Sequence, residues 1–178
     1  MSLRTSLDAL PAEKWKNDMV YFKKIQSEDD LVYATFECEL EEYQRDFVNP
    51  AWFSIGRAYL APEDNYPCII CNSNGENIGF INLIRWMGGG EAVSWSYYVD
   101  KNMQGKGYGR KAAELAVEIL QSVADGKMIK VATEQSNEKA QRLYVSLGLH
   151  KLDELDGDDF VFGRLLSDSR RKCNENHI

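Results

Sequence analysis

The fold of this chain is decided by residues 99–110, which read VDKNMQGKGYGR and join a strand-like run to a helical pattern. Glycines occupy every second position from Gly105 to Gly109, and a glycine backbone turns sharply and admits a ligand closely because no Cβ intervenes. At a helix start, unpaired N–H groups and the helix dipole favour an anion. Lys106 and Arg110 add positive charge there. This segment, the glycine cradle (residues 104–110), predicts a pyrophosphate-binding loop, with a simple tight turn as the alternative.

The spacing of the glycine cradle distinguishes it from two other phosphate-binding loops. A P-loop requires Gly-Lys-Ser/Thr after four intervening residues, and the dinucleotide fingerprint spaces its glycines differently. The cradle matches neither pattern, so ATP and NAD are disfavoured as ligands.

Hydrophobic periodicity on both sides of the cradle predicts one sheet flanked by helices. Residues 93–99 alternate as in a strand, and an apolar stripe at helical spacing runs from Ala112 to Val123. The other expected elements are a strand at 20–22, a helix capped by Ser27, a helix after Asn49-Pro50 with Trp52, Ile55, Ala58 and Tyr59 on one face, a hairpin of 68–71 and 78–86, a turn at 88–90, a strand at 129–133, a helix from Asn137 to Gly148, and a strand at 160–162. That order predicts an α/β or α+β fold.

The length indicates one domain, because 178 residues correspond to about one unit of roughly 150 residues. We expect a polar, loosely attached N-terminal arm at residues 1–17, a single domain at 18–166 and a polar C-terminal tail at 167–178.

The composition disfavours two classes of partner. Lys and Arg number 21 against 28 Asp and Glu, a net charge of −7, and nucleic-acid binding depends on basic residues that neutralise phosphates. No apolar run approaches the length that spans a bilayer, and no signal peptide is visible. We therefore expect a cytoplasmic protein that binds neither nucleic acid nor membrane.

The cysteines do not indicate a metal site. Cys68-x-x-Cys71 is a single pair, and His150 and His177 lie far from it in sequence. Two thiolates do not complete a four-coordinate zinc site. We expect thiols buried in an apolar strand and no metal.

Two motifs carry a family resemblance. The stretch from Val99 to Gly109, with Gln104-Gly-x-Gly107-x-Gly109, resembles the Gln/Arg-x-x-Gly-x-Gly/Ala motif of GCN5-related N-acetyltransferases, the GNAT superfamily. Downstream, the stretch from Asn137 to Gly148 resembles the second signature of that superfamily, although Leu149 stands where the family usually has Phe. The resemblance covers residues 91–166 and implies a mixed, mostly antiparallel sheet of roughly six to seven strands flanked by about four helices.

A looser upstream match, within residues 44–80, resembles bacterial spermine/spermidine (diamine) acetyltransferases. Together the resemblances imply an enzyme that transfers acetyl directly from acetyl-CoA to a primary amine, with a polyamine such as spermidine or spermine as the leading acceptor. They also imply a homodimer by analogy with the family.

The resemblance implies a role for each matched residue. Backbone groups of Tyr97, Tyr98 and Val99 align the acetyl and pantetheine arm, and Asn137 contacts that arm. The pyrophosphate is held by Gln104, Gly105, Lys106, Gly107, Tyr108, Gly109 and Arg110. Tyr144 lies near the thioester sulfur.

Tyr144 is the expected general acid. A phenol of pKa about 10 is able to give its proton to a departing thiolate whose thiol has a pKa of about 8.5. The alternative is an ordinary core tyrosine, because Tyr144 lies on the apolar stripe of its helix. Asn137 and the cradle favour the catalytic interpretation.

Glu134 is the candidate general base, because the acceptor ammonium must lose a proton before it attacks. It ends a predicted strand just before Asn137. A solvated acid at a strand end is the competing interpretation.

Acidic residues gather upstream of the hairpin, at Glu37, Glu39, Glu41, Glu42 and Asp46. We expect Glu37, Glu41 and Glu42 to bind the distal ammonium of a polyamine through charge-assisted contacts. A solvated helix face is the alternative. Cation–π faces are available at Trp52, Tyr59, Trp86 and Trp95, for which core packing is the default.

Two rival functions remain at this point. The first is an acetyltransferase for a protein N-terminus or an amino-acid-like amine. The second is a regulatory module that binds CoA without turnover, against which the intact Asn137 and Tyr144 argue.

Overall fold

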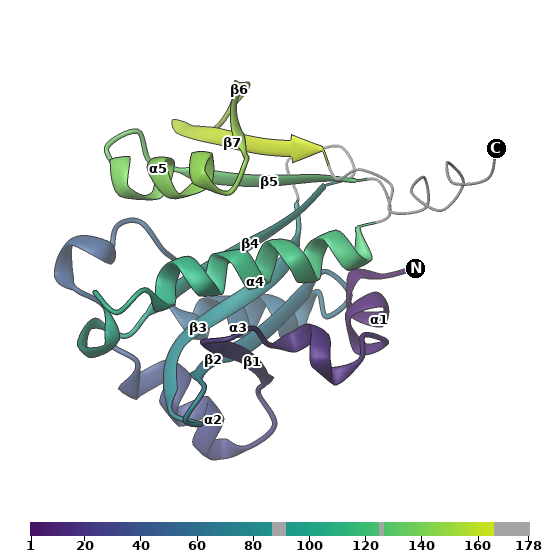
Figure 1. The fold of residues 1–178 in the computed structure, drawn as a ribbon, viewed down its shortest axis with the longest axis vertical. Helices are drawn as coiled ribbons and strands as arrows, with labels where there is room; N and C mark the ends of the chain where they lie inside the picture. The colour runs from purple at the N-terminus through teal and green to yellow at the C-terminus, as the bar shows by residue number, and fades with distance from the viewer. Residues whose placement is uncertain (87–91, 125–126, 166–178) are drawn as a thin grey trace.

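The computed structural model describes residues 1–86, 92–124 and 127–165, which form one sheet with helices on both faces (Figure 1). Its strands are β1 Val20–Lys24, β2 Asn65–Asn72, β3 Asn77–Arg85, β4 Ala92–Val99, β5 Met128–Thr133, β6 His150–Asp156 and β7 Asp159–Leu165. Its α-helices are α1 Leu3–Asp8, α2 Glu28–Val32, α3 Ala51–Leu60, α4 Tyr108–Val123 and α5 Glu138–Ser146. Short 3₁₀ or π segments are η1 Ala12–Trp15, η2 Tyr33–Glu37, η3 Glu42–Gln44 and η4 Lys101–Met103.

The sheet confirms the predicted fold class. Its strand order within the described ranges is β1-β2-β3-β4-β5-β7-β6, and only the β4–β5 pair is parallel. Five α-helices are described where about four were expected, because the N-terminal helix α1 was not predicted.

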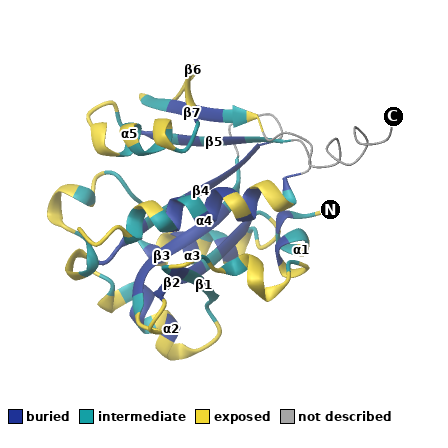
Figure 2. Ribbon diagram, in the orientation of Figure 1, coloured by how far each residue is buried: buried dark blue, intermediate teal, exposed yellow. Residues whose placement is uncertain are grey.

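Hydrophobic side chains fill both faces of the sheet. On one face, α1 and α4 cover a core that includes Leu115 and Ile119, while η2 and α3 cover a second core on the other face, around Phe80 and Tyr98. Figure 2 shows buried residues concentrated in the central strands and on one side of α4. The predicted stripe of α4 is confirmed, because an amphipathic helix buries residues at i, i+3 and i+4.

The cysteines of β2 are buried, as predicted, and point to different faces. Cys68 lies in the core beneath α4, whereas Cys71 lies in the core beneath η2 and α3. The two thiols therefore do not converge on one ion. No cluster of three or more His, Cys, Asp or Glu that would hold a metal occurs among the described residues.

The β4–β5 pair is short for two strands of this length. Their ladder contains only Ala92↔Met128 and Val93↔Ile129, after which the strands diverge (Figure 1). From Ser94 onward, β4 pairs with β3 alone. The sheet is thus split between β4 and β5 toward the carboxyl ends of both strands.

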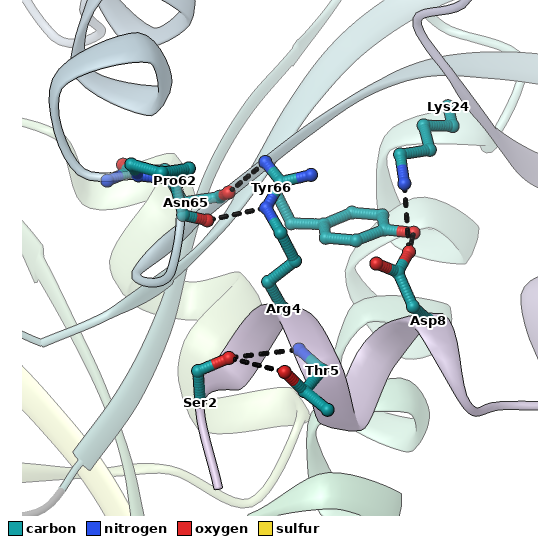
Figure 3. Close-up of polar contacts among 8 residues, drawn as sticks. All are labelled: Ser2, Arg4, Thr5, Asp8, Lys24, Pro62, Asn65 and Tyr66. Carbon is teal, nitrogen blue, oxygen red and sulfur yellow. Dashed lines mark hydrogen bonds and ion pairs between the residues drawn. The ribbon is translucent and has the colours of Figure 1, made fainter.

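Residues 1–17 are attached firmly, contrary to the expected loose arm. Leu3 and Leu7 are buried in the core beneath α1 and α4. Figure 3 shows the polar side of α1: Arg4 donates to the carbonyls of Pro62 and Asn65, and Asp8 accepts from Lys24 and Tyr66. The charged side chains that made this segment look like a loose arm in the sequence form hydrogen bonds with residues far along the chain.

The apolar face predicted for α3 is only partly confirmed, because Ala58 is buried and Ile55 packs against the second core while the two aromatic residues do not. The helix buries Ala51, Ser54 and Ala58, while Trp52 is 62% exposed and Tyr59 is 86% exposed. Small side chains let the helix lie close to the sheet, and the large aromatic residues are left on the outside. Strand β6 was also missed, because most of its residues are exposed and it lacks the alternation that marks a half-buried strand.

The local signals at helix ends are confirmed. Ser27 caps α2 by accepting from the Asp30 N–H, Asn137 caps α5, and Gly148 adopts φ +79° after α5. The predicted turn at 88–90 and the tail at 167–178 lie outside the described residues. No helix in the described ranges is long and apolar enough to cross a membrane.

Candidate active site

The split between β4 and β5 supplies unpaired backbone. Tyr97, Tyr98 and Val99 all lie beyond the last pair with β5 and are paired only with β3. Of their carbonyls, that of Val99 accepts from Gln104 Nε2 at 3.0 Å. A strand with one free edge accepts an extended ligand through backbone hydrogen bonds, as a sheet accepts a further strand. The backbone role expected of residues 97–99 is compatible with this geometry.

The glycine cradle connects β4 to α4 at the open end of the split. Gly105 and Gly107 adopt φ +77° and +86°, a region that L side chains rarely adopt, so these two positions favour glycine. A Cβ built at Gly109 would meet only ordinary contacts, the nearest being Tyr97 Oη at 3.8 Å. The surrounding protein therefore does not require glycine at 109, whereas a ligand seated against the backbone would.

The N-terminus of α4 is open to an anion. Gly107 occupies the N-cap position without a side-chain cap, and the first N–H groups of a helix, here those of Tyr108, Gly109 and Arg110, have no intrahelical partner. Tyr97 Oη donates to the Gly109 carbonyl at 3.0 Å and fixes this end of the helix to β4. These groups fit a pyrophosphate.

The two cations of the cradle are not neutralised by acids. Lys106 lies near the Met103 sulfur, and Arg110 donates to Ser146 Oγ at 2.9 Å, which joins the start of α4 to the end of α5. Neither residue forms an ion pair within the described ranges. Both charges are exposed and available to a ligand.

Gln104 is turned toward the protein. Its Nε2 donates to Val99 O and, at 2.7 Å, to Gln44 Oε1 of η3. The side chain thus links η3 to the end of β4. Only the backbone of Gln104 is left for the predicted contact with pyrophosphate. Sequence reasoning did not find the partnership with Gln44, because the two glutamines come from separate elements.

Asn137 begins α5 at the end of the β5–α5 loop. Its Oδ1 accepts from the Ala140 N–H at 3.1 Å, so one half of the amide is used as the helix cap. The amide NH₂ group forms no hydrogen bond with the described residues and remains available to a ligand.

The ring of Tyr144 is held between strands on either side of β5. It packs edge-on against Trp95 of β4, with centroids 6.1 Å apart, and against Phe162 of β7 at 5.8 Å. Burial raises the pKa of Tyr144 to about 12, and its hydroxyl forms no hydrogen bond with the described residues. Tyr144 is therefore both a packing residue and a neutral phenol whose proton is free for donation.

The contacts of Trp95 and Phe162 with Tyr144 were not predicted, although Trp95 was considered as a face for cation–π contact. Both belong to alternating strand patterns that indicate core packing, and only the folded sheet brings them to Tyr144. The sequence offered one indication of the position of Trp95: it lies two residues before Tyr97, so both side chains are on the same face of β4.

Glu134 directly follows β5, at the same end of the split as Val99, because β4 and β5 are parallel. Its carboxylate accepts from Ser136 Oγ at 3.3 Å and is half-buried. Burial raises the pKa of Asp159, and the nearby negative charge of Glu134 adds to this rise. The surroundings of Glu134 are therefore acidic, which suits a cationic substrate.

The upstream acids lie beside the end of β4. The Glu39 N–H donates to Asp100 at 2.9 Å, and the Gln44–Gln104 bond fixes the same segment to the cradle. Glu39 is paired with Lys101, but Glu37, Glu41 and Glu42 are exposed and form no ion pair with described residues. The structure thus brings this acidic segment beside the cradle and the end of β4.

Another hollow on the surface lies away from these groups. It is lined by Glu13, Lys14, Lys16, Glu118, Gln121 and Ser122. Glu118 is ten residues along α4 from Tyr108, where the helix begins, about 15 Å at the helical rise, so this hollow is separate from the split.

Comparison with known proteins agrees with this geometry. The model of the acetyltransferase (GNAT) family matches residues 29–149. No curated protein matches the sequence. Among solved structures, AAC(6')-Ib in complex with paromomycin and acetyl-CoA superposes with a TM-score of 0.67 at 18% identity, covering 90% of this chain and 100% of that one.

Bacterial acetyltransferases of other kinds show the same likeness. The ribosomal-protein-S5-alanine acetyltransferase from Vibrio fischeri superposes with a TM-score of 0.63 at 16% identity, covering 86% of this chain and 96% of that one. An acetyltransferase from Agrobacterium tumefaciens gives a TM-score of 0.62 at 15% identity, covering 84% and 92%. At these identities the likeness shows the fold alone.

Proposed function

The chain belongs to the acetyltransferase (GNAT) family and uses acetyl-CoA, and we propose that its acceptor is a polyamine such as spermidine or spermine. The alternative acceptors are a protein N-terminus, an amino-acid-like amine and, because AAC(6')-Ib has the same fold, an aminoglycoside. All of them present a primary amine.

The donor site that we propose combines the split and the cradle. The free N–H groups at the start of α4, together with Lys106 and Arg110, would hold the pyrophosphate. The free edge of β4 at residues 97–99 would hold the pantetheine arm, with the Asn137 amide beside it. The unpaired edge of β4 is the observation that carries this assignment.

Acetyl-CoA supplies the acetyl group as a thioester, which the amine attacks directly. We propose that the Tyr144 hydroxyl donates to the sulfur of the departing CoA, because it is neutral and forms no hydrogen bond with the described residues. A phenol of pKa about 12 is a weaker acid than a thiol of pKa about 8.5, so full proton transfer in the ligand-free environment is uphill. Tyr144 therefore acts as a hydrogen-bond donor that stabilises the negative charge developing on the sulfur, and CoA leaves as the thiolate.

The acceptor side of the proposal depends on the acidic segment. Glu37, Glu41 and Glu42 are exposed and unpaired beside the cradle, where a distal ammonium would neutralise them. Trp52 and Tyr59 are exposed on α3 and offer faces for cation–π contact. Glu134, at the end of β5, is the proposed acceptor of the proton that the attacking ammonium releases.

An amine panel tests the acceptor. CoA release is measured by thiol detection with spermidine, spermine, paromomycin and a peptide that begins with alanine, each at several concentrations. We expect the highest kcat/KM for spermidine or spermine. A higher value for the peptide or for paromomycin would replace the polyamine assignment and leave the acetyltransferase activity intact.

Three further expectations remain proposals. These are a homodimer, a cytoplasmic location and the absence of a required metal. Sedimentation of the purified protein at several concentrations tests the first, and activity after dialysis against a chelator tests the last.

A further inference from the structure

A buried donor in the core has no acceptor. The Trp95 side chain is only 5% exposed, and its indole Nε1 forms no hydrogen bond with the described residues. A buried N–H without a partner destabilises a protein, and most such groups in folded chains are paired. A phenylalanine would fill much of the same space without that cost, so the N–H of Trp95 calls for a functional explanation.

Trp95 lies at the split. It is the second residue of β4 beyond Val93, where the ladder with β5 ends. Its side chain shares a face of β4 with Tyr97, whose hydroxyl reaches the start of α4, and its ring contacts Tyr144 of α5. The unpaired N–H thus belongs to a ring between the cradle and the predicted proton donor.

We propose that Trp95 is a cofactor-binding residue, whose indole N–H donates a hydrogen bond to a carbonyl oxygen of the pantetheine arm of acetyl-CoA. This inference rests on the proposed donor site, since it requires the arm to enter the split. An arm alongside residues 97–99 carries amide carbonyls past the face of β4 on which Trp95 stands.

The proposal has a structural consequence for Tyr144. The Tyr144 ring lies against the Trp95 ring, and the Trp95 N–H is closed to solvent. An arm that reaches this N–H therefore requires the side chains around Trp95 to move, and Tyr144 is one of them. Binding of the arm and placement of the phenol are coupled through this aromatic contact.

The first test is Trp95→Phe, with CoA as the probe and its Kd measured by calorimetry. Loss of one hydrogen bond is expected to raise the Kd about fivefold, the equivalent of roughly 1 kcal/mol. Trp15→Phe is the matched control, because it is the same substitution at a tryptophan that stacks on Tyr66 of β2, a strand paired with neither β4 nor β5. We expect its Kd to stay within about twofold of the wild-type value.

The results separate the inference from the proposed function. An unchanged Kd in Trp95→Phe, or an equal rise in both variants, would overturn the role of the N–H. Wild-type protein that binds no CoA would instead overturn the proposed donor site.

Wild-type protein provides a second measurement that does not depend on the folding of Trp95→Phe. The indole N–H signals are followed by ¹H–¹⁵N NMR during CoA titration, and the other tryptophan signals are assigned from Trp15→Phe, Trp52→Phe and Trp86→Phe. The Trp95 signal should move downfield, and its exchange with solvent should slow. A Trp95 signal that stays in place at saturating CoA would contradict the proposal.

Discussion

At the scale of single residues, the proposed mechanism depends on Tyr144, whose ring packs against Trp95 and Phe162. Asn137 and Tyr144 stand seven positions apart in one local motif, so a helix was enough to relate them. Trp95 and Phe162 reach Tyr144 from β4 and β7, and that meeting depends on strand order. The sequence therefore predicted the phenol, whereas the contacts that raise its pKa required the fold.

Tyr144→Phe is expected to lower kcat by roughly 10²-fold and to leave the KM for acetyl-CoA nearly unchanged, because only the proton donor is removed. Tyr21→Phe, on the edge strand β1, is the matched control and should keep full activity. Steady-state kinetics measure both. Equal activity of the Tyr144 variant and the wild type would remove Tyr144 from the mechanism.

The pH profile provides an independent test of Tyr144. Its pKa is raised to about 12, so the protonated, donating form is complete at lower pH and is lost only as pH rises through that value. We therefore expect no alkaline decline of kcat attributable to Tyr144 between about pH 7 and 10. A decline near pH 9 that disappears in Tyr144→Phe would show that the phenol titrates far below the assigned value.

At the scale of elements, periodicity predicted those segments that have one face buried and one exposed. Helix α4 follows this rule and was predicted closely. Strand β4 was also predicted from its alternation, although it is largely buried on both faces. Strand β6 is mostly exposed and α3 turns its smallest residues inward, so hydrophobicity alone missed β6 and placed Trp52 and Tyr59 on the wrong side of α3. The β4–β5 split likewise depends on how many residues of the two strands pair, and no pattern within either strand predicts that number.

Gly107→Ala tests the start of α4. The left-handed backbone of Gly107 should make this change cost about 1 kcal/mol of folding free energy, and the distorted cradle should weaken CoA binding. Gly56→Ala is the matched control, since Gly56 is in the interior of α3 with open space around its Cβ position. That change should stabilise the protein by about 0.5–1 kcal/mol and leave the Kd for CoA unchanged. Denaturant unfolding and calorimetry measure the two effects, and the same sign of stability change in both variants would contradict the assignment.

Leu7→Ala tests whether α1 belongs to the core. Leu7 is fully buried, and removing a buried leucine side chain costs about 2–5 kcal/mol. Leu60→Ala on α3 removes the same atoms from an 81% exposed position and should change the free energy of unfolding little. If Leu7→Ala were as mild as Leu60→Ala in denaturant unfolding, residues 1–17 would be a loose arm after all.

At the scale of the whole molecule, the net charge of −7 is the sum of unlike regions. Lys106 and Arg110, at the start of α4, form no ion pair with the residues that the structure describes, and exposed acids lie on the neighbouring segment that Gln44 ties to the cradle. A polyanionic donor and a polycationic acceptor would each meet the opposite charge at one split in the sheet. Composition alone disfavoured nucleic acid but gave no indication of this separation.

Charge reversal tests the acidic side. Glu41→Lys with Glu42→Lys should raise the KM for spermidine several-fold and change the KM for acetyl-CoA much less. The matched control reverses Glu13 and Glu118, two exposed acids on the separate hollow, with the same change in net charge. An equal rise in the KM for spermidine in both double variants would show that the effect comes from the net charge of the protein and not from binding at Glu41 and Glu42.

The most direct test of the central claim, acetyl transfer from acetyl-CoA to a polyamine, measures both products of one reaction. Purified protein is incubated with acetyl-CoA and spermidine, released CoA is measured by thiol detection, and the polyamine product is identified by mass spectrometry. We expect acetylspermidine and CoA in equal amounts, with both rates falling together in Tyr144→Phe. CoA released without acetylspermidine, or acetylspermidine formed at the same rate by Tyr144→Phe, would contradict it.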